Sequence, residues 1–185
     1  MKRDYRIRAQ KFFRDFYPYL LAQDSFYCTD CVERAIERYI ADHPSRKVDF
    51  ACGSARFAII TSDYVIKWDY DNDNVFEIGG CEDEVKFYRF ARENGFAHLF
   101  AEITPSEYHG FDFYIMPRAY RIGYRCHRGM DISYYISWDE ARWLVEHVRD
   151  LHSFNWGFVH NAPVVIDYAM TEEVINRSSG SSSYT

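Results

Sequence analysis

The sequence of 185 residues predicts an α+β fold, in which two N-terminal helices precede a five-stranded antiparallel sheet with one inserted helix and a reduced, mainly helical second part. Three changes in hydrophobic spacing support this prediction. Residues 4–42 follow a helical period, residues from Val48 onward form short β-branched and aromatic runs, and residues 81–94 return to helical spacing. Because 48% of the residues are hydrophobic, the chain can bury a substantial core.

Two amphipathic helices are expected at residues 4–21 and 29–42. Thr29 or Asp30 would cap the second helix, and His43 with Pro44 would end it. Because wide apolar stripes are rarely left exposed, we expect both helices to pack on the body of the fold and to cover the apolar face of the reduced second part. The residues expected to make this contact are Phe12, Phe13, Phe16 and Ile36.

The strands and remaining helices follow from the same spacing argument. Ser62 and Asp63 form the turn of a hairpin, and Asn94 with Gly95 ends the inserted helix at residues 81–94. Ser137 with Glu140 is a capping-box signature that opens a further helix. A last short hairpin is expected from residues 158–159 and 164–166. The five strands of the sheet are expected at residues 48–51, 56–61, 64–68, 99–103 and 111–116.

The charge pattern excludes some classes of function. A net charge of -6 argues against a general nucleic-acid-binding protein, because neutralising phosphates requires a basic surface. Residues 2–14 are a local exception, and they form either a solvated helix face or a strip that faces an acidic partner. No apolar run approaches the roughly 20 residues that span a bilayer, so we expect a soluble, cytoplasmic protein. The basic residues of the strip are Lys2, Arg3, Arg6, Arg8, Lys11 and Arg14.

The cysteines leave two interpretations open. Five is an odd number, which fits reduced thiols better than a disulfide framework. Cys28 and Cys31 have a CxxC spacing that zinc accepts, and the alternative is a pair of ordinary thiols on a helix face. A zinc site would have to recruit further ligands from Cys52, Cys81, Cys126 or His127.

The pattern with the clearest chemistry is DLHSFN at residues 150–155, followed by VVID at residues 164–167. Phosphoryl transfer requires a carboxylate at the acceptor hydroxyl, oxygen ligands for Mg²⁺ and a cation at the nucleotide phosphates. A loop that carries Asp150 and Asn155 can place the first at the acceptor and the second on the metal. Asp167, at the end of a nearby strand, completes the metal site.

These residues resemble the catalytic machinery of protein kinases. Arg149, Asp150 and Asn155 resemble the catalytic loop H-R-D-x-x-x-x-N, and Asp167 begins a segment similar to D-F-G. The resemblance implies that Asp150 is the catalytic base and that Asn155 and Asp167 bind Mg²⁺. His152, two positions after Asp150, resembles aminoglycoside kinases and small bacterial or phage kinases more than eukaryotic enzymes.

The first half of the chain resembles the nucleotide-binding lobe of the same family. Residues 64–67 resemble the V-A-I-K strand, which implies that Lys67 holds the α- and β-phosphates of ATP and pairs with Glu84. Residues 53–58 resemble the glycine-rich loop, with Ala55 and Ala58 in place of its second and third glycines. Met116 resembles the gatekeeper beside the adenine. The resemblance therefore places these residues at the nucleotide: Gly53, Ser54, Ala55, Phe57, Lys67, Met116 and Arg118.

The resemblance also implies a two-lobed, protein-kinase-like organisation. Residues 1–47 would be a helical extension, residues 48–117 the nucleotide lobe, residues 118–177 a reduced C-lobe, and residues 178–185 a flexible tail. Sixteen residues follow Ala169, too few for a full activation segment and for the helices that dock peptide substrates. This small size looks like that of compact kinases carried by bacteriophages.

The expected function is ATP- and Mg²⁺-dependent phosphoryl transfer to a Ser, Thr or Tyr hydroxyl of a protein. Two alternatives remain open, namely a pseudokinase that binds and inhibits a host or partner protein and a small-molecule kinase, which His152 suggests. The presence of both metal ligands favours catalysis, because a binding scaffold has no need for them. The full constellation is Lys67, Glu84, Asp150, Asn155 and Asp167.

Overall fold

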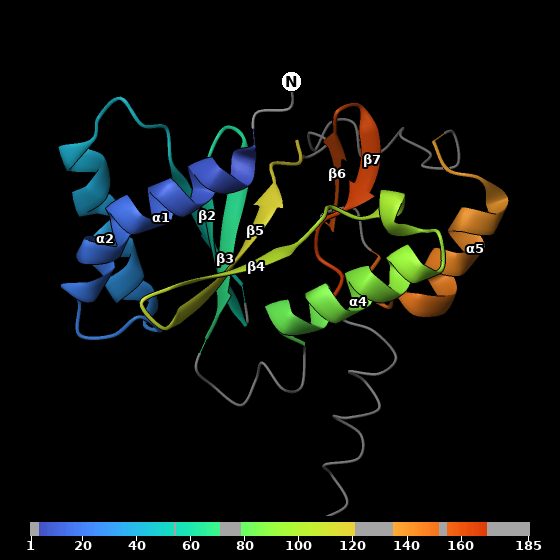
Figure 1. Ribbon diagram of the computed structural model, residues 1–185, viewed down its shortest axis with the longest axis horizontal. Coiled ribbons are helices and arrows are strands. Elements are labelled where there is room, and N and C mark those ends of the chain that lie inside the picture. The colour runs from blue at the N-terminus through green and yellow to red at the C-terminus, as the bar shows by residue number, and fades with distance from the viewer. Residues whose placement is uncertain (1–3, 54, 71–78, 121–134, 152–154, 170–185) are drawn as a thin grey trace, which may run out of the picture. The chain divides into compact units, whose positions relative to one another are not determined.

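The computed structural model describes residues 4–53, 55–70, 79–120, 135–151 and 155–169. The chain divides into two compact units, and each of them combines helices with β-strands (Figure 1). The first unit comprises Met1–Val75 and Thr104–Arg118, and the second comprises Phe76–Ile103 and Ala119–Thr185. Among the described residues, no helix is both long enough and apolar enough to cross a membrane.

The first unit begins with the two helices that the spacing predicts, α1 (Tyr5–Leu21) and α2 (Thr29–Asp42). Asp4 caps α1, because its carboxylate accepts a hydrogen bond from the backbone N–H of Arg6 at 3.1 Å. The expected cap of α2 is wrong, since Cys28 occupies the N-cap position and makes no capping hydrogen bond through its side chain. Asp30 lies in the first turn instead, where its charge favours the helix dipole.

Five strands of this unit form one antiparallel sheet in the order β1-β2-β3-β5-β4. The register places Lys67 of β3 between Ala58 of β2 and Tyr114 of β5. Because side chains alternate between the two faces of a sheet, these three side chains share one face. The strands are β1 (Asp49–Cys52), β2 (Arg56–Ile60), β3 (Tyr64–Asp69), β4 (Thr104–Tyr108) and β5 (Phe111–Pro117).

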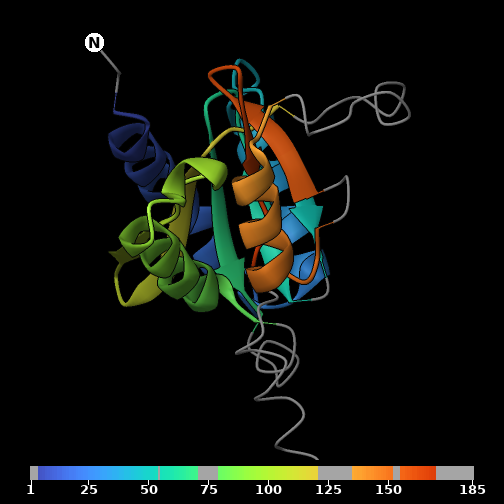
Figure 2. The same ribbon diagram turned by 90° about the vertical axis from the view of Figure 1, so that its right-hand side faces the viewer.

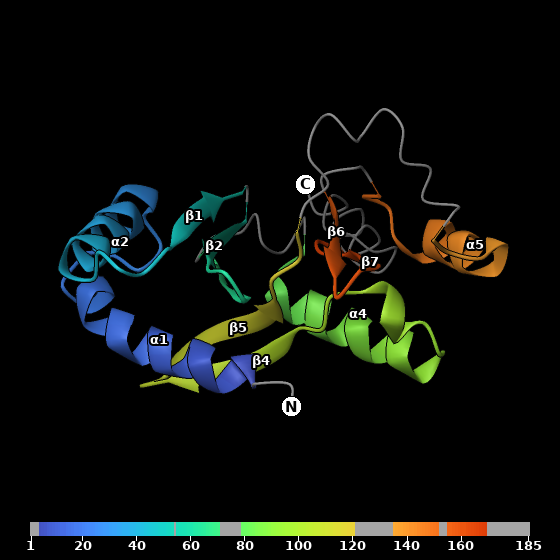
Figure 3. The same ribbon diagram turned by 90° about the horizontal axis from the view of Figure 1, so that it is seen from above.

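Helices α1 and α2 cover the opposite face of the sheet. Phe13 stacks on Phe113 with ring centroids 4.0 Å apart, and Phe12 meets Tyr64 edge-on at 6.2 Å. Figures 1 and 3 show α1 running along β5 on this side. The expectation that the helices cover the reduced second part is wrong. The apolar stripes of both helices belong to one core cluster with the alternating apolar residues of β2, β3 and β5, within the first unit.

Trp68 lies at the centre of this aromatic core. Its side chain is 1% exposed, and its indole N–H donates a hydrogen bond to the backbone oxygen of Phe26 at 3.3 Å. Its ring lies 5.3 Å from that of Phe57 and 6.4 Å from that of Phe13. The polar atom of a large buried ring is thus satisfied while the rest of the ring fills the core.

The second unit contains the helices α4 and α5, the short helix η1 and the hairpin of β6 and β7 (Figure 2). Phe87 of α4 holds this unit together through ring contacts with Phe100 (5.3 Å), Trp143 (5.9 Å) and Tyr168 (6.1 Å). These contacts explain why α4 groups with the second unit and not with the sheet. The elements are α4 (Cys81–Glu93), the 3₁₀ helix η1 (Ala97–Leu99), α5 (Trp138–His147), β6 (Trp156–Val159) and β7 (Ala162–Val165).

The strand expected at residues 99–103 is wrong. Leu99 ends η1, and the extended backbone that follows pairs with β7 at one bridge, between Phe100 and Val165. The backbone N–H of Ala101 donates to the oxygen of Val165 at 2.9 Å. The apolar residues that suggested a strand are buried in the core of the second unit, and the fourth strand of the sheet begins at Thr104.

Candidate functional site

The first unit presents Lys67 on the sheet face that the helices leave uncovered. Val65 and Met116 are paired across β3 and β5 and share this face with Lys67. Met116 is 2% exposed, while Val65 and Lys67 are half-buried. The Lys67 cation therefore lies on this face beside the apolar side chains of Val65 and Met116.

The predicted glycine-rich loop is a tight turn between β1 and β2. The backbone N–H of Gly53 donates to the oxygen of Arg56 at 2.9 Å, and the hydroxyl of Tyr70 donates to the oxygen of Gly53 at 2.8 Å. Ala55 is 2% exposed, and its oxygen accepts a hydrogen bond from the backbone N–H of Tyr70 at 2.8 Å. Ser54 lies outside the described residues. The turn is thus tied to the residue that follows β3.

Phe57 does not belong with these loop residues. Its side chain is fully buried on the helix-covered face and contacts the rings of Trp68 and Tyr70 at 5.3 and 4.3 Å. The strand period explains the difference, since Phe57 and Ala58 point to opposite faces of β2 and Ala58 shares the face of Lys67. Arg118, the other flanking residue, is half-buried, and its backbone N–H donates to the oxygen of Asp63 at 2.9 Å.

In the second unit, Asp150 and Asn155 are brought together. The side-chain amide of Asn155 donates to the backbone oxygen of Asp150 at 2.8 Å and to a carboxylate oxygen of Asp150 at 3.1 Å. Asn155 is 6% exposed, and its side-chain oxygen Oδ1 accepts no hydrogen bond from any described residue. An amide oxygen beside a carboxylate is a suitable ligand for a hard cation.

The β6–β7 hairpin brings the end of the predicted metal strand back to this loop. The backbone N–H of Ile166 donates to the oxygen of Asn155 at 2.7 Å. Because Trp156 pairs with Val165, the residues just outside this pair lie at the same end of the hairpin. Asp167 directly follows Ile166, so the backbone places Asp150, Asn155 and Asp167 at one end of the hairpin.

Glu84 is fixed to the same segment from the other side. Its side chain is fully buried in the first turn of α4, and a carboxylate oxygen accepts a hydrogen bond from the backbone N–H of Tyr168 at 3.3 Å. The hydroxyl of Tyr168 donates to the oxygen of Ala101 at 2.7 Å. Burial raises the pKa of Tyr168 well above its usual value, and the nearby Glu84 carboxylate adds to this effect. The residue after Asp167 is therefore held at both its backbone and its side chain.

Gly79 completes the packing around this segment. Its φ is +79°, which favours glycine, and a Cβ atom at this position would lie 2.7 Å from the backbone oxygen of Ala169. The backbone just before α4 packs directly against the segment that follows Asp167, and this close packing requires that residue 79 has no side chain.

The structure brings together some of the predicted residues and leaves one pair as a prediction. Glu84, Asp150, Asn155 and Asp167 lie in the second unit and are joined directly or through their neighbours. Lys67 lies in the first unit, and its pairing with Glu84 stays a prediction. His152 lies outside the described residues.

Tyr168 and Gly79 help to position the Asp167 segment, and the sequence alone predicted no role for either residue. The signals were a tyrosine in an apolar run directly after Asp167 and a glycine two residues before a helix.

No group of three or more His, Cys, Asp or Glu side chains suited to a metal ion occurs among the described residues, which exclude Cys126 and His127. In the described part of the second unit, Asn155 and the neighbouring carboxylates offer oxygen donors to a cation.

The comparisons with known proteins add no assignment. The chain matches no protein-family model, and no curated protein matches it.

Proposed function

We propose that this protein is an ATP- and Mg²⁺-dependent phosphotransferase with a minimal protein-kinase-like organisation, acting on a Ser, Thr or Tyr hydroxyl of a protein. The observation that carries this proposal is the buried amide of Asn155, which joins Asp150 and, through its backbone, the segment of Asp167. Polar side chains are rarely buried without a reason. In the described part of the chain the buried polar or charged side chains are Glu84 and Asn155, both members of the predicted constellation.

The oxygen donors of this cluster fit a magnesium ion. Asn155 offers its amide oxygen and Asp167 its carboxylate, and both are hard ligands of the kind that Mg²⁺ prefers. When bound, Mg²⁺ with ATP would supply the activated phosphoryl group and neutralise its developing charge. The amide of Asn155 also orients Asp150, because it donates to both the backbone and the side chain of that residue.

Each polar residue then has a distinct role. Asp150 orients the acceptor hydroxyl and accepts its proton. Lys67 offers its cation to the phosphates from the uncovered face of the sheet. Glu84 positions the Asp167 segment through the backbone of Tyr168. Electrostatic positioning of this kind accounts for most of the catalytic effect in phosphoryl transfer.

Three variants of the full chain test these roles. Asp150→Ala should abolish transfer and leave the affinity for ATP nearly intact, because this carboxylate acts on the acceptor. Asp167→Ala should lose both transfer and Mg²⁺-dependent binding of ATP. Lys67→Ala should weaken binding of the phosphates. Calorimetric titration with ATP, with and without Mg²⁺, is run beside a radiolabelled phosphotransfer assay on a cell lysate.

Asp24→Ala is the matched control, since it removes an exposed carboxylate from a loop of the first unit. It should change neither binding nor transfer. If the wild-type protein binds no ATP under either condition, the proposal is refuted. Binding of ATP without transfer to any acceptor would instead assign the pseudokinase function, in which the same residues hold a nucleotide without turnover.

A further inference from the structure

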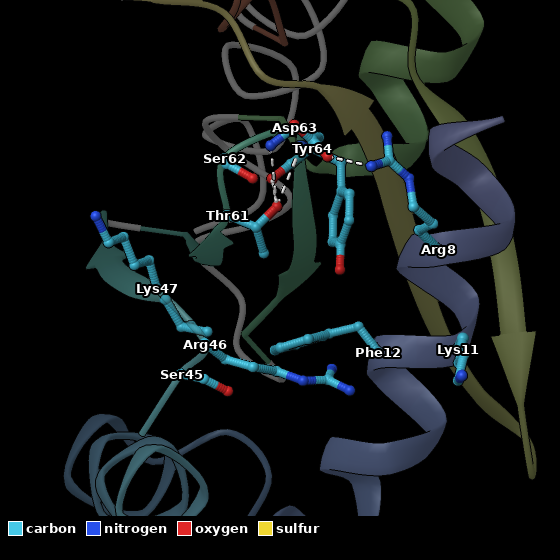
Figure 4. A pocket seen from close by; sticks show the side chains of 11 residues that line it. Arg8, Lys11, Phe12, Ser45, Arg46, Lys47, Thr61, Ser62, Asp63 and Tyr64 are labelled. Atoms are coloured by element: carbon cyan, nitrogen blue, oxygen red, sulfur yellow. Dashed lines mark hydrogen bonds and ion pairs between the residues drawn. The ribbon is translucent and has the colours of Figure 1, made fainter. Parts of the chain in front are cut away.

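The first unit contains a pocket of about 370 Å³ at the end of the sheet where β2 turns into β3. Helix α1, residues 45–48 and residues 61–64 line it (Figure 4). Gly53 lies at the other end of β2, and Lys67 lies on the face of β3 opposite to Tyr64. The pocket is therefore distinct from the site of Gly53 and Lys67, and Arg118 borders it through the hydrogen bond of its backbone N–H to the oxygen of Asp63.

The lining of this pocket is strongly cationic. It includes four basic side chains and one acidic side chain, although the whole protein carries a net charge of -6. Within the described part of the chain, Lys11 and Lys47 form neither an ion pair nor a hydrogen bond through their side chains. Such a concentration of positive charge in a concave site attracts anions. The four basic residues are Arg8, Lys11, Arg46 and Lys47.

Arg46 is held in place before any ligand arrives. Its backbone N–H donates to the oxygen of His43 at 2.9 Å, and its guanidinium donates to Asp15 at 3.2 Å. The guanidinium also lies 5.9 and 5.8 Å from the ring centroids of Phe12 and Tyr39. These contacts leave few rotamers to the side chain, so binding an anion costs little further conformational entropy.

Arg8 is paired with Asp63, but this pair is exposed. Both side chains are about two-fifths accessible, at 42% and 41%. An exposed ion pair stabilises a protein by about 1 kcal/mol or less. A dianion in the pocket can therefore compete with Asp63 for the guanidinium of Arg8.

Tyr64 adds a hydroxyl group to the lining of this pocket. Its side chain is 7% exposed, and Figure 4 shows its hydroxyl pointing into the hollow beside α1. The hydroxyl of Thr61 donates to the backbone oxygen of Tyr64 at 2.9 Å, and hydrogen bonding to the Thr61 side chain partly offsets the effect of burial on the pKa of Tyr64. Burial raises the pKa of Tyr64 to about 12, so the hydroxyl keeps its proton at neutral pH and remains a donor. An anion in the pocket can therefore accept a hydrogen bond from this hydroxyl.

We propose that this pocket binds a phosphate group, either as inorganic phosphate or as the phosphomonoester of a small molecule. A phosphate offers acceptor oxygens to the guanidinium groups of Arg8 and Arg46 and to the hydroxyl of Tyr64. The volume of the pocket lies within the range of small-molecule sites, roughly 300–1,000 Å³, so it has room for more than the ion alone. This site is additional to the proposed phosphotransferase site and does not depend on it.

Calorimetric titration of the full chain tests the site with two probes, inorganic phosphate and glycerol 3-phosphate, at neutral pH and low NaCl. Tyr64→Phe keeps the ring and removes only the donor, and it should weaken binding about tenfold or more, because hydrogen bonds to charged groups contribute about 1.5–3 kcal/mol. Lys11→Ala should weaken binding about threefold, and NaCl should weaken it further.

Two matched variants separate a built site from general attraction. Tyr19→Phe removes a hydroxyl that bonds Asp42, and Lys86→Ala removes an exposed cation of the second unit. Both should bind the probes as the wild type does. A thermal melt of each variant shows that it is folded.

The two probes distinguish the source of the phosphate. Tighter binding of glycerol 3-phosphate supports a phosphorylated small molecule, and equal binding supports the free ion. The proposal is overturned if neither probe binds, if Tyr64→Phe binds as the wild type does, or if Lys86→Ala weakens binding as much as Lys11→Ala.

Discussion

Replacing Phe13 by alanine should remove the central contact between α1 and the sheet. The side chain is fully buried, and its ring contacts Phe113 at 4.0 Å, Phe111 at 5.6 Å and Trp68 at 6.4 Å between centroids. Phe→Ala changes in a core typically cost about 3–5 kcal/mol, since the transfer free energy of the ring is lost and a cavity remains. The stacked pair with Phe113 places Phe13→Ala toward the upper part of this range.

The expected loss is a large fraction of the stability of the protein. Domains are stabilised by about 5–15 kcal/mol in total, and in a chain of this size each kcal/mol lowers the melting temperature by roughly 2–4 °C. Phe13→Ala should therefore lower it by roughly 10 °C. Urea denaturation followed by circular dichroism measures the free energy of unfolding, and a thermal melt gives the shift.

Leu21→Ala is the matched control, because Leu21 lies on the same helix and is 59% exposed. This change should alter the free energy of unfolding by about 0.5 kcal/mol or less. If Phe13→Ala melts within the error of the wild type, the packing of α1 on the sheet described above is refuted. A loss of similar size in Leu21→Ala would mean that burial does not set the effect, since alanine is the better helix former of the two residues.

Three further predictions concern single groups. A hydrogen bond with His98, and after it the hydrogen bonds with Ser137 at the helix cap, lower the pKa of Glu140 from 4.5 to about 2. The stabilisation from the Glu140 carboxylate is therefore complete above pH 4.5 and is lost as the pH falls toward 2. Glu140→Gln should remove this pH dependence, which amounts to about 1 kcal/mol or less in the free energy of unfolding, and thermal melts across this pH range would show it. Cys28 should react with iodoacetamide before Cys31. Hydrogen bonds from the backbone N–H and the side chain of Cys31 lower the pKa of Cys28, while hydrogen bonding to Cys28 and burial raise the pKa of Cys31. Equal labelling of the two thiols in a mass-spectrometric time course would contradict this prediction. Tyr168→Phe should cost about 1–2 kcal/mol in urea denaturation, because it leaves the oxygen of Ala101 without its donor, and an unchanged midpoint would show that this bond contributes nothing.

The helices and most strands could be predicted because their residues carry a strong period. Phe12, Phe13 and Phe16 recur at helical spacing, and Tyr64, Ile66 and Trp68 alternate along β3. The apolar run near Leu99 misled the prediction, since a short run of this kind is compatible with a strand or with any buried segment. Spacing along the chain shows that a residue is apolar, but it does not show which surface covers it.

The candidate site was predictable only in part for a similar reason. The spacing of Asp150 and Asn155 within one loop identified a pair that the structure joins directly. The support that Tyr168 gives to Glu84 depends on residues 84 positions apart, and no local pattern reveals such a contact. Phe57 shows the opposite case, because a resemblance to a loop motif gave it a role that the alternation of β2 assigns to the core.

The position of Trp68 makes the first unit optically distinct. Of the four tryptophans in the chain, Trp68 lies in the first unit, and Trp138, Trp143 and Trp156 lie in the second. A variant with phenylalanine at the other three positions would report the fluorescence of one indole, held at 1% exposure among aromatic rings. Its emission should shift to longer wavelength only when the aromatic core opens to water. Recorded beside circular dichroism of the same sample, this single emission band would show whether the sheet and the second unit unfold in one cooperative step or in two.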